Sequence, residues 1–334
     1  IDAFCTNLLR ENVHLLELDE GRSLTADFRV LDESEADLLR RRVLPKVLEA
    51  FYSDLTPGGA MLADAFGFGR DDRGLEALVL ELYAKIQSHA YPEKWLEEQK
   101  KSWQEIPNDA GKTVFGQELL SAMRRKVHHW ITVFKDCVVQ MEMDEELVKG
   151  YGKVFLLDIA MLENIEQKLN DGWDEALSCA PEWGTLSGSR KSQAVEFKEK
   201  LKSIRARCKK EIAAAFSILS ASASDAVLDL KNCAGAMTAL LDLCGDFSTA
   251  YRAEKLRRNV TDFSDQEHYA IALLLERDGE PTPLARMVAQ RYLEVMVDEY
   301  QDTNQVQNCI FSAISRNEQN LFTVGDVKQS IYRF

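Results

Sequence analysis

The chain has 334 residues, of which 46% are apolar, and it carries a formal net charge of −14. The apolar content is sufficient for a folded core, and the length predicts two or three domains or subdomains. The negative charge argues against a protein that binds nucleic acid through bulk charge, but a local groove with stacking aromatic residues and a few basic ones is compatible with it.

The composition also indicates the cellular environment. No apolar run approaches the length of about 18 residues that a membrane span needs, so no membrane association is expected. The first residues lack the basic and apolar regions of a secretory signal, and the chain begins with Ile1 rather than Met, as expected for a segment of a longer protein. The seven cysteines include no Cys-x-x-Cys pair, which favours a reducing cytoplasm over a disulfide framework or a zinc site.

The N-terminal part predicts a helix, a strand and a second helix. Residues 1–17 show helical spacing of apolar side chains, and Phe28–Leu31 is typical of a strand. Asp32 is expected to cap the next helix together with Glu35, which stands three residues further on. Pro45 is expected to kink or end that helix.

Helical periodicity then dominates residues 52–250, which we interpret as an all-helical subdomain. Helices are predicted over residues 75–88, 91–103, 113–142, 145–169, 197–219 and 224–243. Turns or loops are expected at residues 56–59, 67–74 and 181–192.

The predicted helix 197–219 carries a basic stripe beside its apolar one. Lys202 and Arg205 lie on this stripe and are candidate contacts for the phosphates of duplex DNA. A solvated helix face is the alternative interpretation. Further along, Asp262 is predicted to cap a helix over Ser264–Leu275.

The last forty residues predict two strands joined by a helix. Tyr292–Val297 and Leu321–Val324 are apolar runs, and each ends in a polar turn, Asp298–Asn304 and Gly325–Phe334. Such runs fit buried strands of a parallel sheet with a right-handed crossover helix between them. The two turns would then meet at the carboxyl ends of the strands, where ligands bind in open parallel sheets.

The residue types in these turns suit phosphoryl transfer. Asp298 is the candidate ligand of Mg²⁺, and Glu299 is the candidate base that orients or deprotonates water. Gln329 is placed to reach a terminal phosphate, and Gln301 is included among the candidate catalytic residues. The alternative is an Asp-Glu pair that merely caps a strand.

The turn Asp298–Asn304 resembles the Walker B motif of superfamily 1 DNA helicases of the UvrD type, and Gly325–Phe334 resembles their next motif. Lys328 before Gln329 is similar to the helicase–nuclease branch, the AddA-like enzymes. The stretch Asp262–His268 resembles the Asp-Phe-Ser-Asp-x-Glu-His sequence of the same branch.

The resemblance implies a partial RecA-like parallel sheet of a P-loop NTPase motor, with a large helical insertion in a mostly α chain. Residues 1–51 and 251–334 would form the motor, and residues 52–250 the insertion. It further implies ATP and Mg²⁺ as cofactors. The expected partners are single-stranded DNA, a duplex end and an AddB-like subunit, in a bacterial cytoplasm. Phe4, Tyr332 and Phe334 match positions that contact or stack on DNA in this family.

No Gly-x-x-x-x-Gly-Lys-Ser/Thr sequence occurs, although Gly111-Lys112-Thr113 supplies its last three residues. A P-loop needs such glycines to cradle phosphates. The chain alone is therefore expected not to hydrolyse ATP. Two alternatives stay open: a UvrD-like repair helicase without a nuclease, and a non-catalytic helical module that binds DNA or a partner.

Overall fold

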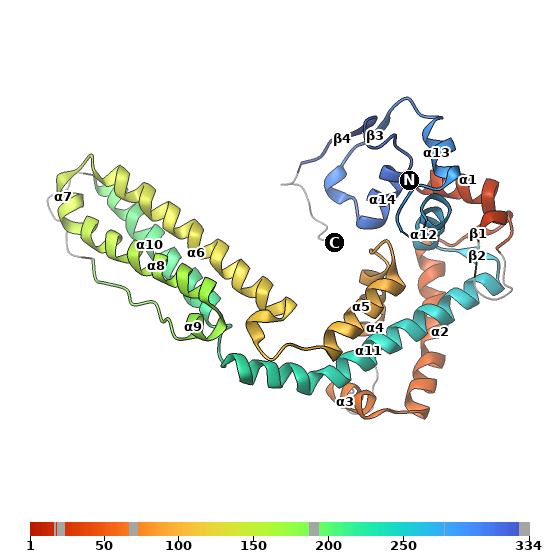
Figure 1. Cartoon of the computed structure of the whole chain (residues 1–334), viewed down its shortest axis with the longest axis horizontal. Helices are drawn as coiled ribbons and strands as arrows, with labels where there is room; N and C mark the ends of the chain where they lie inside the picture. Colours follow the sequence, from red (N-terminus) through yellow and green to blue (C-terminus); the bar gives the residue numbers. More distant parts are fainter. Residues whose placement is uncertain (17, 19–23, 67–72, 187–193, 277, 327–334) are drawn as a thin grey trace. The chain divides into compact units, whose positions relative to one another are not determined.

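The computed structural model describes residues 1–16, 18, 24–66, 73–186, 194–276 and 278–326 (Figure 1). The chain forms two compact units. The first contains Ile1–Gln104 and Ala234–Phe334, and the second contains Glu105–Cys233. Among the described residues, strands occur only in the first unit. No described helix combines the length and the apolar content that crossing a membrane requires.

The first unit consists of helices and short strands from both ends of the chain. Its N-terminal elements are α1 (Asp2–Asn12), η1 (Val13–Leu15), β1 (Arg29–Val30), α2 (Glu33–Ser53), α3 (Pro57–Phe66), α4 (Arg73–Ile86) and α5 (Pro92–Gln104). Its C-terminal elements are β2 (Val260–Thr261), α12 (Phe263–Leu274), α13 (Pro283–Ala289), β3 (Val295–Val297), η4 (Tyr300–Asp302), α14 (Gln305–Ala313) and β4 (Leu321–Thr323). The long helix α11 (Ala223–Arg257) contains the chain boundary between the units.

Two small parallel sheets lie in the first unit. β1 pairs with β2, and β3 pairs with β4 in the register Val295↔Leu321, Met296↔Phe322 and Val297↔Thr323. The predicted strands and their parallel pairing are therefore confirmed, and so is a mostly helical chain with small parallel sheets. The RecA-like motor, the helical insertion and the boundaries at residues 51 and 250 stay predictions.

Local capping signals placed two helices correctly. Asp32 caps α2, since its Oδ1 accepts a hydrogen bond from the Glu35 amide at 2.8 Å and the Glu35 carboxylate accepts one from the Asp32 amide at 3.2 Å. The prediction that Pro45 kinks or ends the helix is wrong about an end, because α2 continues to Ser53. Buried side chains on both sides of Pro45, such as Leu44 and Leu48, offset the backbone hydrogen bond that proline cannot make.

The helix predicted over residues 224–243 is longer than expected. α11 passes through Gly245 and ends at Arg257, because Phe247 and Tyr251 extend its apolar face and are fully buried. Both rings pack edge-on against Tyr83 of α4, with centroids 5.1 and 5.9 Å away. The apolar face thus stabilises the helix beyond the glycine, whose own cost is about 1 kcal/mol.

The last turn of α11 carries a buried ion triad. The Nζ atom of Lys255 lies 2.9 Å from the Asp262 carboxylate and 2.6 Å from the Asp265 carboxylate, and it sits over the Tyr251 ring. Asp262 and Asp265 also form the capping box of α12, as predicted for Asp262. Burial alone would lower the pKa of Lys255, but the two carboxylates outweigh it and hold that pKa above its ordinary value.

The second unit is a helical bundle. Its elements are η2 (Ala110–Lys112), α6 (Val114–Met141), α7 (Glu145–Leu147), the π-helix η3 (Val148–Gly152), α8 (Lys153–Asp171), α9 (Trp173–Leu177) and α10 (Val195–Phe216). Helices α6, α8 and α10 run side by side in Figure 1 and share one apolar core. The helices predicted over residues 113–142 and 197–219 are confirmed as α6 and α10.

Lys255→Met tests the buried triad. Loss of the ammonium leaves two largely buried carboxylates without their cation, so the free energy of unfolding is expected to fall by about 3–5 kcal/mol. Urea unfolding measures this. The matched control is Lys85→Met, which removes an exposed pair with Glu81 and is expected to cost no more than about 0.5 kcal/mol. Equal effects of the two substitutions would contradict the role of the triad.

The triad also predicts a pH dependence. Burial and then the charge of Asp262 raise the pKa of Asp265 to about 6, whereas its unfolded value is about 3.9. Between these values the folded state binds the extra proton, so this contribution to stability falls as pH rises, by up to about 1.4 kcal/mol per pH unit. The pKa of Asp262 is lowered, so its own effect lies below this window.

Asp265→Asn should therefore flatten the dependence of unfolding free energy on pH between about 4 and 6. Urea unfolding across this range is the measurement. Asp64→Asn, an exposed change on α3, is the matched control and should keep the wild-type slope. A slope unchanged by Asp265→Asn would show that this carboxyl does not titrate there.

Candidate functional site

The polar turns after β3 and β4 lie against each other. The Val324 amide donates to the Val297 carbonyl at 2.9 Å, and the Tyr300 amide donates to the Val324 carbonyl at 2.8 Å. These bonds continue the strand pairing past the ends of both strands. The two turns therefore meet at the carboxyl ends of the strands, as the sequence predicted.

Asp298 and Glu299 are exposed at the end of β3. Glu299 has a left-handed backbone, with φ of 51° and ψ of 41°, and its amide donates to the Asp298 Oδ1 at 2.9 Å. A residue with a Cβ adopts this conformation at a cost of about 1–2 kcal/mol. Backbone strain of this kind is concentrated at functional sites, where surrounding contacts hold it in place.

Gln301 links the two turns. Its Nε2 donates to the Glu299 carboxylate, and its Oε1 accepts from the Asp326 amide at 2.9 Å. A Cβ at position 325 would lie 2.6 Å from the Gln301 Oε1 and 3.0 Å from the Gln301 amide nitrogen. Glycine at position 325 therefore permits the close approach of the turn after β4.

A further layer of hydrogen bonds holds the acidic turn against the helices. The Tyr300 hydroxyl donates to Asn308 of α14 at 2.6 Å, and Asn304 caps α14 by accepting from the Gln307 amide. The Gln307 side chain donates to Glu267 of α12 at 2.8 Å. Burial raises the pKa of Glu267 above its ordinary value.

The donor set at this turn fits Mg²⁺. Asp298 and Glu299 offer adjacent exposed carboxylates, and one buried oxygen of Asp302 in the same turn has no hydrogen-bond partner. Within the described residues, no group of three or more His, Cys, Asp or Glu side chains could hold a metal on its own. Mg²⁺ keeps several waters and commonly binds one or two carboxylates plus substrate phosphates, so these residues suit it.

The expectation of buried strands is wrong for the described chain. Met296 is 70% exposed and Phe322 is 61% exposed, whereas Val295 is partly buried against the core that contains α14. The described sheet has two strands, so alternate side chains point away from the core rather than into a second layer. Apolar content predicted the strands, but burial depends on neighbouring elements.

The remaining candidates fall into three groups. Gln329, Tyr332 and Phe334 lie outside the described residues. Phe4, on α1, is half-buried and packs against the core formed with α12, and its DNA contact stays a prediction. Lys202 is exposed and pairs with Glu199 at 2.6 Å, which raises the pKa of its ammonium.

Arg205 requires a correction. Its side chain is 6% exposed, and its Nε lies 2.5 Å from the Asp158 carboxylate of α8. The same guanidinium donates to the Gly184 carbonyl at 2.7 Å and lies over the Trp183 ring. Arg205 therefore belongs to the interior of the helical bundle and not to an exposed basic stripe. The stripe was predicted from helical phase, which does not reveal a buried carboxylate on another helix.

The sequence analysis missed the partners that hold the site. These are Glu267, Gln307 and Asn308, together with Lys255 of the triad. A lysine within the apolar stretch Tyr251–Val260, shortly before two acidic residues, was the available signal for Lys255. The other three gave no local signal, because their partners are side chains on other elements.

Comparison with known proteins identifies the family. The family model for the UvrD/REP helicase N-terminal domain matches residues 1–334, which is the whole chain. The chain therefore belongs to the UvrD/REP helicase N-terminal domain family. The resemblance of its two motifs to UvrD-type helicases is confirmed.

The more particular similarity is to AddA proteins, which are named for an ATP-dependent helicase/nuclease. Those of Ruminiclostridium cellulolyticum and Acetivibrio thermocellus are each 32% identical over the whole chain, which covers 27% of each protein. That of Desulfitobacterium hafniense is 34% identical, again over the whole chain, with 25% of its own length covered. The chain thus spans about a quarter of the length of these relatives, and the predicted resemblance to the helicase–nuclease branch is confirmed.

Arg205→Met compared with Lys202→Met tests the correction. The first change leaves Asp158 as a buried charge without its partner and should cost about 3–5 kcal/mol of unfolding free energy. The second removes an exposed pair and should change it by less than about 0.5 kcal/mol. Urea unfolding provides both values. The double variant Asp158→Leu/Arg205→Met should recover most of the loss, and similar costs for the two single variants would refute the structural role.

Proposed function

We propose that this chain is part of an ATP-dependent DNA helicase–nuclease and carries the carboxylates for nucleotide hydrolysis. The observation that carries the proposal is the Gln301 side chain, which bonds the Glu299 carboxylate and the Asp326 amide at once. An acidic turn and the turn after the neighbouring strand are thereby held as one site. Family membership and the names of the relatives support the same function.

Each residue of the acidic turn has a proposed role. Asp298 holds Mg²⁺ through an exposed carboxylate, and Glu299 orients a water molecule and accepts its proton. Gln301 fixes the Glu299 carboxylate by donating to it, which keeps the proton acceptor in one position. When bound, ATP with Mg²⁺ would supply the phosphoryl group and neutralise the charge on its oxygens.

The proposal extends to DNA. Gln329 couples the nucleotide to the DNA track, and Tyr332 and Phe334 stack on bases of a single strand. Phe4 adds an aromatic contact, and Lys202 contacts the phosphates of the duplex. The complete protein would process double-strand breaks for recombinational repair with an AddB-like partner, in a bacterial cytoplasm. Residues 1–51 and 251–334 would belong to its RecA-like motor, and residues 52–250 to a helical insertion.

Glu299→Gln in the longer protein is the test of this assignment. The amide cannot accept the proton of water, so DNA-stimulated ATP hydrolysis should fall by about 10²–10⁴-fold while ATP binding is retained. A coupled ATPase assay and binding of a fluorescent nucleotide measure the two properties. The control is Glu294→Gln, an exposed change just before β3 that should leave the rate unaltered. A Glu299→Gln protein with the wild-type rate would overturn the proposed role. The 334-residue chain by itself is proposed to be inactive because it has no P-loop sequence.

A further inference from the structure

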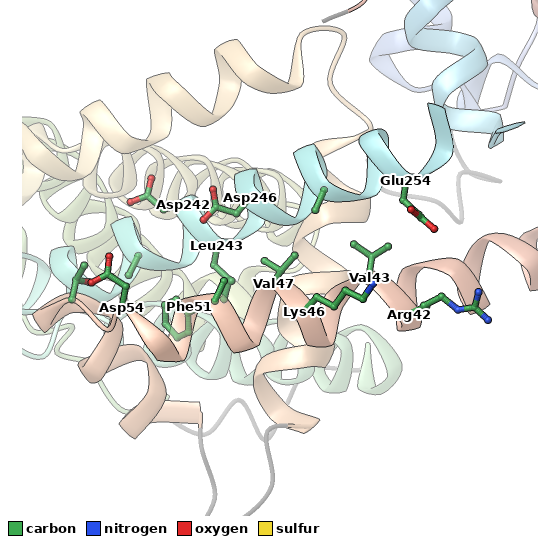
Figure 2. A pocket seen from close by; sticks show the side chains of 14 residues that line it. Arg42, Val43, Lys46, Val47, Phe51, Asp54, Asp242, Leu243, Asp246 and Glu254 are labelled. Atoms are coloured by element: carbon green, nitrogen blue, oxygen red, sulfur yellow. The ribbon is translucent and has the colours of Figure 1, made fainter. Parts of the chain in front are cut away.

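A groove in the first unit lies between α2 and α11, away from the acidic turn (Figure 2). Its cavity volume is about 550 Å³. The residues that line it are Arg42, Val43, Lys46, Val47, Ala50, Phe51, Asp54 and Thr56 on the side of α2, and Ala239, Asp242, Leu243, Asp246, Ala250 and Glu254 on α11. None of these residues has a role in the proposed ATP or DNA site.

The shape of the groove suits an extended occupant. On α2 it extends from Arg42 to Asp54, and on α11 from Ala239 to Glu254. At a rise of about 1.5 Å per residue, these stretches are about 18 and 22 Å long. A volume of 550 Å³ over that length leaves a cross-section of only about 25–30 Å². The groove therefore has room for a row of side chains but not for a second backbone.

The floor of the groove is apolar. Val43, Val47 and Leu243 are buried at its base, and the partly buried Phe51 and Ala250 extend the same surface. Apolar side chains from an occupant would remove this surface from water, which contributes about 25 cal/mol per Å² buried. The floor is therefore suited to apolar side chains that project from one face of a helix.

One end of the groove carries uncompensated negative charge. Asp242 and Asp246 stand one helical turn apart on α11, and Asp54 lies at the end of α2, as Figure 2 shows. Asp242 pairs with Lys100 at 2.5 Å, but in the described part of the chain neither Asp54 nor Asp246 has an ion pair. Partial burial and then the charge of Asp242 raise the pKa of Asp246. A cation from an occupant would relieve this repulsion.

The opposite end of the groove is different. Figure 2 shows Arg42 there with Glu254, and Lys46 between the two ends. Glu254 is already paired with Arg257 at 2.8 Å and Arg258 at 2.6 Å, and these cations lower its pKa to about 2. Arg42 and Lys46 have no ion pair among the described residues. The groove thus has an acidic end and a basic end.

We propose that this groove docks an amphipathic helix of another protein, with apolar side chains on the floor and a lysine or arginine against Asp246 and Asp54. Charge complementarity and the long, shallow shape favour this occupant. Nucleic acid is disfavoured because its phosphates would face three carboxylates at the acidic end. A compact small molecule would leave most of the apolar floor uncovered. The proposal is independent of the proposed ATPase function, since it uses none of the same residues.

Two matched synthetic peptides test the proposal on the intact chain. Both carry leucines on one helical face, and they differ only in whether arginine or glutamate flanks the leucines. Fluorescence anisotropy of the labelled peptides measures binding. The arginine peptide should bind the chain at least about tenfold more tightly than the glutamate peptide, and the difference should shrink in high salt. Equal binding of the two peptides, or no binding of the arginine peptide, would overturn the proposal.

Three variants localise the binding. Asp246→Asn/Asp54→Asn should weaken the arginine peptide about tenfold, because two ion pairs are lost, and Asp64→Asn on α3 should not weaken it. Ala50→Trp places a large ring in the groove from an exposed position and should abolish binding, with the fold checked by circular dichroism. Binding that survives Ala50→Trp, or a single-stranded oligonucleotide that displaces the peptide from the groove, would contradict a helix-docking site.

Discussion

The buried ammonium of Lys255 is the interaction on which the first unit depends. It neutralises Asp262 and Asp265, which also cap α12, so one cation holds the last turn of α11 and the first turn of α12 together. From α12, Glu267 accepts from Gln307, the residue whose amide is capped by Asn304 of the acidic turn. A continuous series of polar contacts therefore extends from the buried cation to the turn that carries Asp298 and Glu299.

Local signals predicted much of the fold, and tertiary contacts account for what they missed. Capping boxes at Asp32 and Asp262 need residues only three positions apart, so the sequence reveals both. The continuation of α2 past Pro45 depends on buried neighbours, which a local rule does not include. The exposure of Met296 and the burial of Arg205 likewise depend on which elements lie opposite, and residue spacing contains no such information.

The candidate site shows the same division. Residue type and position after an apolar strand were sufficient to single out Asp298 and Glu299, and the meeting of the two turns followed from parallel pairing. The contacts that hold these carboxylates were not predictable, because Gln301 reaches a backbone amide 25 residues away. The need for glycine at position 325 becomes evident only from that close approach. Chemistry was thus predictable from the turn, whereas its support was not.

Paramagnetic broadening by Mn²⁺, used as a probe for Mg²⁺, tests the assignment of the acidic turn most directly. In amide NMR spectra of the chain, Mn²⁺ should broaden the signals of Glu299, Tyr300 and Asp326 first, since these amides surround the Asp298 carboxylate and the adjoining turn. Asp298→Asn should remove that broadening. Broadening centred instead on Asp242 and Asp246, with the acidic turn unaffected, would contradict a metal site at the end of β3.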